Sequence, residues 1–334
     1  MALAKFNLSS WKPFLPAVID NTKPKLVPPT IKLAQLALHA MPRLTRVTKL
    51  SFTSTKALDG SFEGASSDAS LIIPKTIQII KNRLRSLHIQ SLFAMYLPPS
   101  ELQLESLETF SLDALAPYHT PQIHAIMLDK IPAFLLAHKS TIRNMLFAID
   151  HSDLDASPIF QCLTAMPCLY DISFFLPSAD MYPFRGKSDL FVVHRQHLRS
   201  LSLSIKTTGL SLNGILRLLL QNWLRRLVTF PVRTLTVCTP SMLFIRALTI
   251  YIISQFSSLV SLVLSDMISP FSDSGLRLQD FCKQISGFPC LQNLGLSLDT
   301  FRELDLCTLA RNLPHLRSLL ANYQNERIIS PVSV

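Results

Sequence analysis

The sequence predicts an α/β solenoid, in which short parallel strands alternate with helices along the chain. Three observations predict it: an apolar hexad that recurs through the chain, helix-like spacers between the hexads, and prolines at the junctions between the two. The chain has 334 residues, of which 48% are apolar and 16% are charged. This composition supplies ample material for a core.

The hexad carries apolar residues at its first, fourth and sixth positions. Alternation with period two places positions four and six on one face of a short strand, and position one beneath the preceding turn. The starts of the eleven hexads are 16 to 37 residues apart. In chain order the hexads are VTKLSF at 47–52, LRSLHI at 84–89, LETFSL at 107–112, IHAIML at 123–128, IRNMLF at 142–147, LYDISF at 169–174, LRSLSL at 198–203, VRTLTV at 232–237, LVSLVL at 259–264, LQNLGL at 291–296 and LRSLLA at 316–321.

The spacers are long enough for helices, and proline marks where they end. Residues 209–227, for example, place five apolar side chains on one helical face. A proline stands two residues before the hexad at Pro121, Pro167, Pro289 and Pro314. Proline stops a helix and biases its neighbour towards extended geometry. The pattern therefore predicts a parallel sheet backed by helices.

These boundaries divide the chain into three predicted parts. Residues 1–46 form a basic leader, in which 31–41 read as an amphipathic helix that caps the first repeat. Residues 47–321 form the array of about ten to eleven irregular repeats, with a flexible surface loop at 58–70 that is rich in serine and glycine. Residues 322–334 form a C-terminal tail.

The net charge of +10 is concentrated at the start of the chain. Residues 1–90 hold 13 Lys and Arg against four acidic residues, and the remaining residues hold 19 against 18. Two interpretations are open. The leader is either an arm that meets an anionic partner, or a solvated segment that its lysines keep soluble.

The hexads with helical spacers and Pro-x-Leu junctions resemble the irregular leucine-rich repeats of F-box/leucine-rich-repeat proteins, particularly the fungal set. The resemblance covers about residues 47–321 and implies a horseshoe-shaped solenoid that recognises proteins through its concave strand face. The asparagine that ends many leucine-rich strands is absent, since LGLSLDT has Leu298 and Asp299 there.

In that family an F-box near the N-terminus docks on a Skp1-type adaptor of a ubiquitin ligase. Here FLPAVID offers Leu15, Pro16 and Ile19 in a loosely matching order. The prolines of the following NTKPKLVPPT segment exclude a helix, so the match ends there. The F-box is therefore absent or degenerate.

The sequence shows no catalytic, metal or cofactor signature, so we expect a protein that is not an enzyme and needs no cofactor. The six cysteines form no C-x-x-C pair and read as thiols in a reducing compartment, which indicates the cytoplasm or nucleus. His194 and His197 lie three residues apart, but no further ligand accompanies them. We expect no metal site.

The stretch ALTIYIISQFSSLVSLVL, residues 247–264, has no charge and the length of a membrane span. Its last six residues are a hexad, and residues 241–257 fit the helix of the preceding repeat. It also contains Gln255 and five serines or threonines, which suit lipid poorly. We expect a buried repeat and no membrane partner.

Arginine occupies the second hexad position in five repeats. Equivalent positions of a stacked array form a ladder, so these arginines either bind acidic side chains or phosphates, or cover the apolar rim with their stems. Positions three and five are mostly small and polar. The candidate partner-binding residues are Arg85, His88, Arg143, Asn144, Tyr170, Asp171, Arg199, Ser202, Arg233, Thr236 and Arg317.

Together these observations predict a protein-interaction module, and the resemblance implies the substrate-recognition part of a ubiquitin-ligase receptor. The partner would be a protein substrate, with a Skp1-type adaptor only weakly supported. The alternative is a solenoid that binds nucleic acid or phosphate through the basic leader and the arginines. It lacks interleaved aromatic residues for stacking on bases, which counts against it.

Overall fold

The computed structural model describes residues 2–7, 39–43, 45–53, 63–114, 121–149, 155–176, 193–194, 197–205, 232–238, 258–265, 286, 288–298 and 303–323. The chain divides into two compact units, Met1–Cys168 and Leu169–Val334, which we call unit 1 and unit 2. Each is built around a parallel sheet, so the α/β class predicted from the hexads is confirmed.

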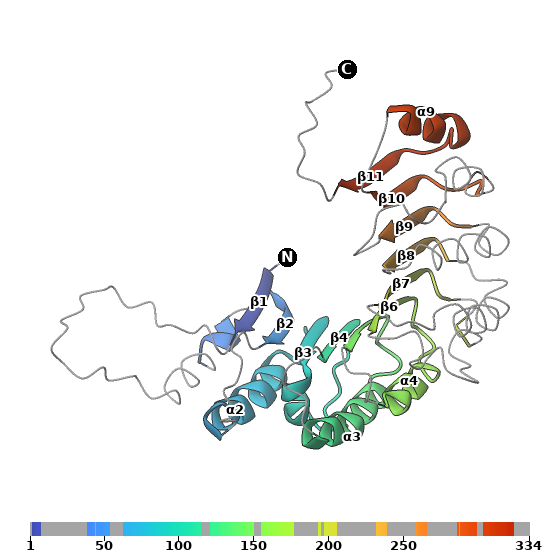
Figure 1. Ribbon diagram of the computed structural model, residues 1–334. Helices are drawn as coiled ribbons and strands as arrows, with labels where there is room; N and C mark the ends of the chain where they lie inside the picture. Colours follow the sequence, from blue (N-terminus) through green and yellow to red (C-terminus); the bar gives the residue numbers. More distant parts are fainter. Residues whose placement is uncertain are drawn as a thin grey trace, which may run out of the picture. The chain divides into compact units, whose positions relative to one another are not determined.

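The described residues of unit 1 form five strands, paired in parallel in chain order. Helices α2 and α3 lie on the same side of the strands (Figure 1). The strands are β1 (Ala2–Asn7), β2 (Val47–Thr53), β3 (Ser86–Gln90), β4 (Thr109–Ala114) and β5 (Asn144–Ile149). The helical elements are η1 (Met41–Arg43), α2 (Glu63–Ile80), η2 (Ser91–Tyr96), α3 (Pro121–Ala137) and α4 (Ser157–Leu163).

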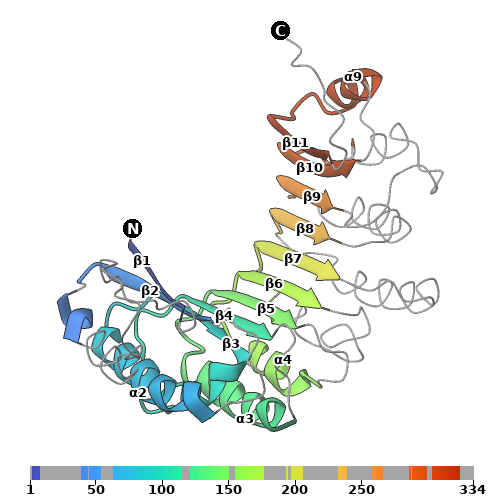
Figure 2. The ribbon, with the colours of Figure 1, turned by 60° about the vertical axis from the view of Figure 1, so that its left-hand side comes forward.

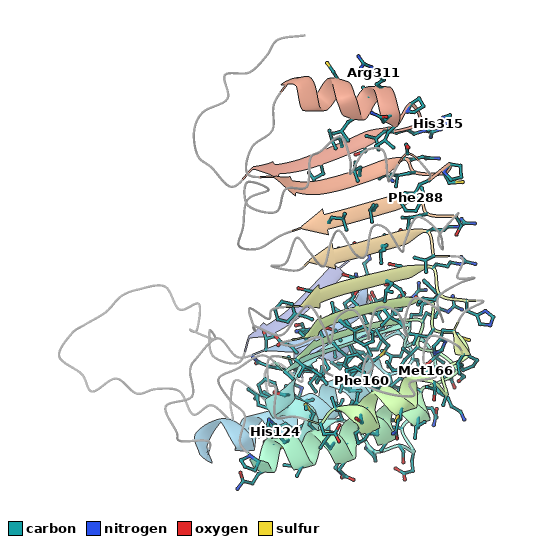
Figure 3. All side chains as sticks on the ribbon, turned by 45° about the vertical axis from the view of Figure 1, so that its right-hand side comes forward. His124, Phe160, Met166, Phe288, Arg311 and His315 are labelled. Atoms are coloured by element: carbon teal, nitrogen blue, oxygen red, sulfur yellow. The ribbon has the colours of Figure 1, made fainter. Side chains whose placement is uncertain are left out.

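The core of unit 1 lies between the strands and these helices. Phe110 on β4 meets Phe134 on α3, with ring centroids 5.2 Å apart, and Phe147 on β5 meets the edge of Phe160 on α4 at 5.5 Å. Figure 3 shows the layer of side chains to which Phe160 belongs. Each contact joins a fourth or sixth hexad position to a helix, so one sheet face is fixed as the inner one.

In the part of unit 2 that the structure describes there are six strands, again paired in parallel in chain order. Their arrows all point the same way in Figure 2. The strands are β6 (Asp171–Leu176), β7 (Ser200–Ile205), β8 (Thr234–Cys238), β9 (Ser261–Ser265), β10 (Asn293–Leu298) and β11 (Ser318–Tyr323), and helix α9 (Glu303–Asn312) precedes β11.

Ten of the eleven hexads form strands, and their side chains alternate as predicted. The fourth positions from β2 to β10 are buried, including Leu201 and Leu294, whereas Ser202 beside Leu201 is half-buried on the other face. Pro167 and Pro314 lie between a helix and a strand, as the junction pattern predicts.

The strand predicted for IHAIML at 123–128 is wrong. This segment lies inside α3, and Pro121 begins that helix instead of ending an earlier one. The buried residues Ile123, Met127 and Ile131 are four residues apart, which is the period of a helix and not of a strand. The pattern of the hexad shares its first interval of three residues with a helix, and this caused the error.

The flexible loop predicted at 58–70 is also wrong over 63–70, because α2 begins at Glu63. In the leader, residues 2–7 form β1, which pairs with β2 and was not predicted. Outside the described residues lie Leu15, Pro16 and Ile19, most of the capping helix at 31–41, and the helices predicted at 209–227 and 241–257.

Two further predictions concern a membrane span at residues 247–264 and a metal site, neither of which we expect from the sequence. The end of the uncharged stretch 247–264 forms β9, with Leu259 and Leu262 buried. Among the described residues, no helix is long and apolar enough to cross a membrane. The same residues contain no cluster of three or more His, Cys, Asp or Glu side chains that could hold a metal ion.

Candidate functional site

The third and fifth hexad positions lie on the face of each sheet opposite the buried fourth positions, and we call this the outer face. In unit 1 the strand register aligns the third positions in one row and the fifth positions in another. Two cross-strand hydrogen bonds order these rows. Nδ1 of His88 and the Ser111 hydroxyl lie 2.7 Å apart, and the Asn144 amide donates to the Thr109 hydroxyl at 3.0 Å. The predicted residues His88 and Asn144 are therefore held in place on this face.

In unit 2 the same two rows run across six strands. The third-position row is almost wholly polar, with side chains that are half-buried or exposed. Its members are Asp171, Ser200, Thr234, Ser261, Asn293 and Ser318. The fifth-position row contains Ser173, Ser202, Thr236, Val263, Gly295 and Leu320, so it changes from polar to apolar towards β11.

Gly295 lies where this change occurs. A Cβ atom at Gly295 would be 3.0 Å from Cγ1 of Val263, so the valine side chain already fills the space above the glycine. Leu320, on the next strand, is 58% exposed. The face therefore offers an apolar spot beside its small hydroxyl and amide groups.

Asp171 is the one carboxyl group in the two rows of unit 2. Burial raises the pKa of Asp171 above its ordinary value, and a hydrogen bond from the Ser200 side chain partly opposes this. The carboxyl is thus engaged by its own neighbour on β7 and contributes a hydrogen-bonding group to the face.

The residues at the second hexad position form what we call the second-position column, at the N-terminal ends of the strands. At seven of these positions the carbonyl oxygen accepts two backbone N–H groups from the next repeat. The Arg199 carbonyl, for example, accepts from Arg233 at 2.8 Å and from Thr234 at 3.1 Å. The same joint recurs at Arg85, Glu108, Tyr170, Arg233, Val260 and Gln292.

The charges of the column differ between the two units. In unit 1, Glu108 lies between Arg85 and Arg143, so cation and anion alternate. In unit 2, Arg199 and Arg233 are direct neighbours, and no acid occupies the column. All four arginines are exposed. The positive charge of the predicted arginine ladder is therefore balanced by Glu108 in unit 1, whereas in unit 2 no acidic residue of the column balances it.

Tyr170 precedes Arg199 in the column and touches it. The guanidinium carbon of Arg199 lies 6.0 Å from the centroid of the Tyr170 ring, within reach of a cation–π interaction. This contact could not be read from the hexads, which place the two residues on adjacent strands but do not fix their rotamers.

The structure brings the predicted site residues together within two sets. Unit 1 holds Arg85, His88, Arg143 and Asn144. Unit 2 holds Tyr170, Asp171, Arg199, Ser202, Arg233, Thr236 and Arg317. Sequence reasoning missed that Glu108 directly neighbours Arg143, because the mistaken hexad at 123–128 stood between them.

No family model matches this chain, and no curated protein matches it. Among solved structures, a chain of the TLR13–ssRNA13 complex is 16% identical with a TM-score of 0.35, and the match covers 86% of this chain and 38% of that one. The apo homocysteine methyltransferase MmuM from Escherichia coli is 15% identical with a TM-score of 0.23, covering 86% and 88%. This chain thus spans well under half of the TLR13 chain. Similarities this low carry no argument about fold or function.

Proposed function

We propose that the protein is a leucine-rich-repeat solenoid whose outer strand face binds a protein partner. The observation that carries this proposal is the polar outer face itself. Parallel sheets in most α/β proteins are covered on both faces. Here the described helices α3 and α4 of unit 1 pack on the inner face, and the outer rows of unit 2 hold small polar side chains in register on β6 to β9.

The chemistry of the face suits a protein more than a nucleic acid. Hydroxyl and amide groups in rows offer hydrogen bonds to a polypeptide, and Val263 and Leu320 add an apolar contact near β11. Recognition of single-stranded nucleic acid rests on exposed aromatic rings for base stacking. In unit 2 the ring of Tyr170 is already engaged by Arg199.

The resemblance to F-box/leucine-rich-repeat proteins adds a finer proposal, that the bound protein is a substrate of a ubiquitin ligase. A Skp1-type adaptor would then bind the leader, and the protein would act in the cytoplasm or nucleus without catalysing a reaction. Mixing the purified chain with a Skp1-type adaptor and separating complexes by size tests this. Two separate peaks would remove the ligase role and leave partner binding in place.

Partner binding itself is tested with a variant that blocks the face. Ser202 and Thr236 are cross-strand neighbours in the fifth-position row, and both are half-buried. Replacing both with arginine fills the row with long side chains and should abolish recovery of partners that the wild type captures. Each captured partner is then purified and its affinity for wild type and variant measured directly.

The matched control also introduces two arginines, but at exposed helical positions of the other unit. Gln122 on α3 and Gln161 on α4, both exposed, are changed to arginine. We expect the control to bind like the wild type. Equal loss in both variants would mean that added charge, and not the outer face, governs binding.

A further inference from the structure

The strongest unassigned feature is the pair of adjacent arginines in the column of unit 2. Arg233 donates its backbone N–H to the Arg199 carbonyl at 2.8 Å, so the two residues occupy successive strands. Neighbouring strands lie about 4.8 Å apart. Both side chains are exposed, and within the described residues no carboxylate forms an ion pair with either.

Two guanidinium groups that approach each other across adjacent strands repel when nothing lies between them. At about 4 Å in water the repulsion is about 1 kcal/mol, and it grows where solvent is excluded. A carboxylate placed between two guanidinium groups converts this repulsion into attraction through charge-assisted hydrogen bonds. Unit 1 shows the compensated alternative, because Glu108 stands between Arg85 and Arg143.

Arg199 is also oriented before any ligand arrives. The carbon of its guanidinium lies 6.0 Å from the centroid of the Tyr170 ring, within reach of a cation–π interaction. A guanidinium held by an aromatic ring loses less side-chain entropy on binding, which favours a planar, bidentate anion.

A second basic group lies further along the same edge. Arg317 is in the column three strands beyond Arg233, with Val260 and Gln292 between them. Arg311 on α9 and His315 in the turn before β11 are exposed at this end of unit 2, and Figure 3 labels both. From the midpoint between Arg199 and Arg233 to Arg317 there are three and a half strand spacings, about 17 Å, which an extended peptide spans in about five residues.

From this geometry we infer that the N-terminal edge of the unit 2 sheet binds an acidic protein segment with two acidic groups separated by about five residues. One carboxylate sits between Arg199 and Arg233, and the second meets Arg317. The intervening residues lie over Val260 and Gln292, which are half-buried and uncharged. This inference rests on the proposed protein-binding function and names the chemistry of the partner.

The test uses the purified full-length chain and a fluorescent peptide with two Glu-Glu pairs in that spacing, followed by fluorescence anisotropy. Changing both Arg199 and Arg233 to glutamine keeps hydrogen-bonding groups and removes the charges. We expect binding about tenfold weaker, the loss typical of a charge-assisted contact. Changing both to lysine keeps the charges but not the bidentate geometry, and should restore only part of the affinity.

The matched control removes the same net charge elsewhere. Lys75 and Lys81 are exposed in unit 1 and lie outside the column, so the K75Q/K81Q variant should bind the peptide as the wild type does. A peptide with glutamine in place of glutamate should not bind. Equal weakening in both double variants, or binding of the glutamine peptide, would overturn the inference.

A second arm separates peptide from nucleic acid. If single-stranded RNA binds more tightly than the acidic peptide and is lost with R199Q/R233Q, the edge binds nucleic acid and the inference is wrong. If the wild type binds neither, the inference also fails. Neither result contradicts the proposed function, because that function is tested separately by partner recovery with the outer-face variant S202R/T236R.

Discussion

The backbone N–H of Leu104 donates a 3.1 Å hydrogen bond to Nε2 of His138, 34 residues further along the chain. Nε2 must therefore be an acceptor, and the proton of the neutral ring sits on Nδ1, which donates to the Phe134 carbonyl at 2.8 Å. The ring is 1% exposed and stacks on Phe134 with centroids 4.4 Å apart. His138 thus connects the end of α3 to the turn that leads into β4.

This arrangement predicts that acid destabilises unit 1. Burial lowers the pKa of His138 below its ordinary value of 6.5, and the backbone contacts oppose this only in part. The unfolded chain therefore binds the proton more readily, so stability is fully present above 6.5 and is lost as pH falls through the lowered folded-state pKa. Urea unfolding measured from pH 7.5 to 5 should show the decline.

Two variants isolate the histidine. His138→Gln can still accept from Leu104 and donate to Phe134, so it should keep most of the stability at pH 7 while reducing the decline in acid. His138→Leu leaves the Leu104 N–H unpaired, whereas the Phe134 carbonyl still accepts the backbone N–H of residue 138, and should cost about 1–3 kcal/mol at pH 7. A pH dependence identical in the wild type and both variants would assign the acid response to other groups.

The strand register of unit 2 predicts opposite outcomes for neighbouring residues. Leu201 is 0% exposed and Ser202 is half-buried on the outer face. Leu201→Asp buries an unpaired charge and should destabilise by about 3–5 kcal/mol, whereas Ser202→Asp should cost under about 1 kcal/mol. Thermal melts of the two variants check this. Equal damage would mean that the alternation is misassigned.

Helix α3 gives a test of the corrected hexad. Met127 is 0% exposed and Ile126 is half-buried, whereas a strand at 123–128 would bury Ile126 instead. Met127→Ala should cost about 2–5 kcal/mol and Ile126→Ala clearly less, because alanine suits a helix at both positions. Denaturant midpoints provide the measurement, and the reverse order would restore the strand.

Removing the negative charge of Glu108 should strengthen binding of the acidic peptide. Glu108→Gln removes the anion between Arg85 and Arg143, leaving two exposed cations on either side of a neutral residue. In the R199Q/R233Q background this change should strengthen binding of the acidic peptide about two- to fivefold, the range of an exposed charge contact. Anisotropy titration at low salt measures it, and a Glu108→Asp variant, which keeps the charge, should show no gain.

The hexads predict most of the strands because a parallel sheet with one buried face demands strict alternation. Leu87, Phe110 and Leu235 are buried at fourth positions for this reason, and their serine and threonine neighbours face outward. The same signal failed at 123–128, where the intervals of a helix imitate part of the hexad. It also missed β1, since ALAKFN lacks the pattern and gains its structure from pairing with β2.

The sequence predicts where the candidate site residues lie along the strands, but not the contacts that their side chains make. Register alone places Arg199 beside Arg233 and aligns Ser202 with Thr236. The contact of Arg199 with Tyr170 and the hydrogen bond from Ser200 to Asp171 depend on side-chain rotamers, which sequence spacing does not determine. That Glu108 is the direct neighbour of Arg143 follows only once residues 123–128 are placed in α3 and not in a strand.

The doubly accepting carbonyls of the second-position column join successive repeats through main-chain atoms alone. Arginine, glutamate, tyrosine, valine and glutamine all occupy this joint with the same geometry. The side chain at each position of the column can therefore change without disturbing the main-chain hydrogen bonds that join the repeats. The edge that we propose for partner binding can thus carry different side chains while the main-chain hydrogen bonds beneath it stay the same.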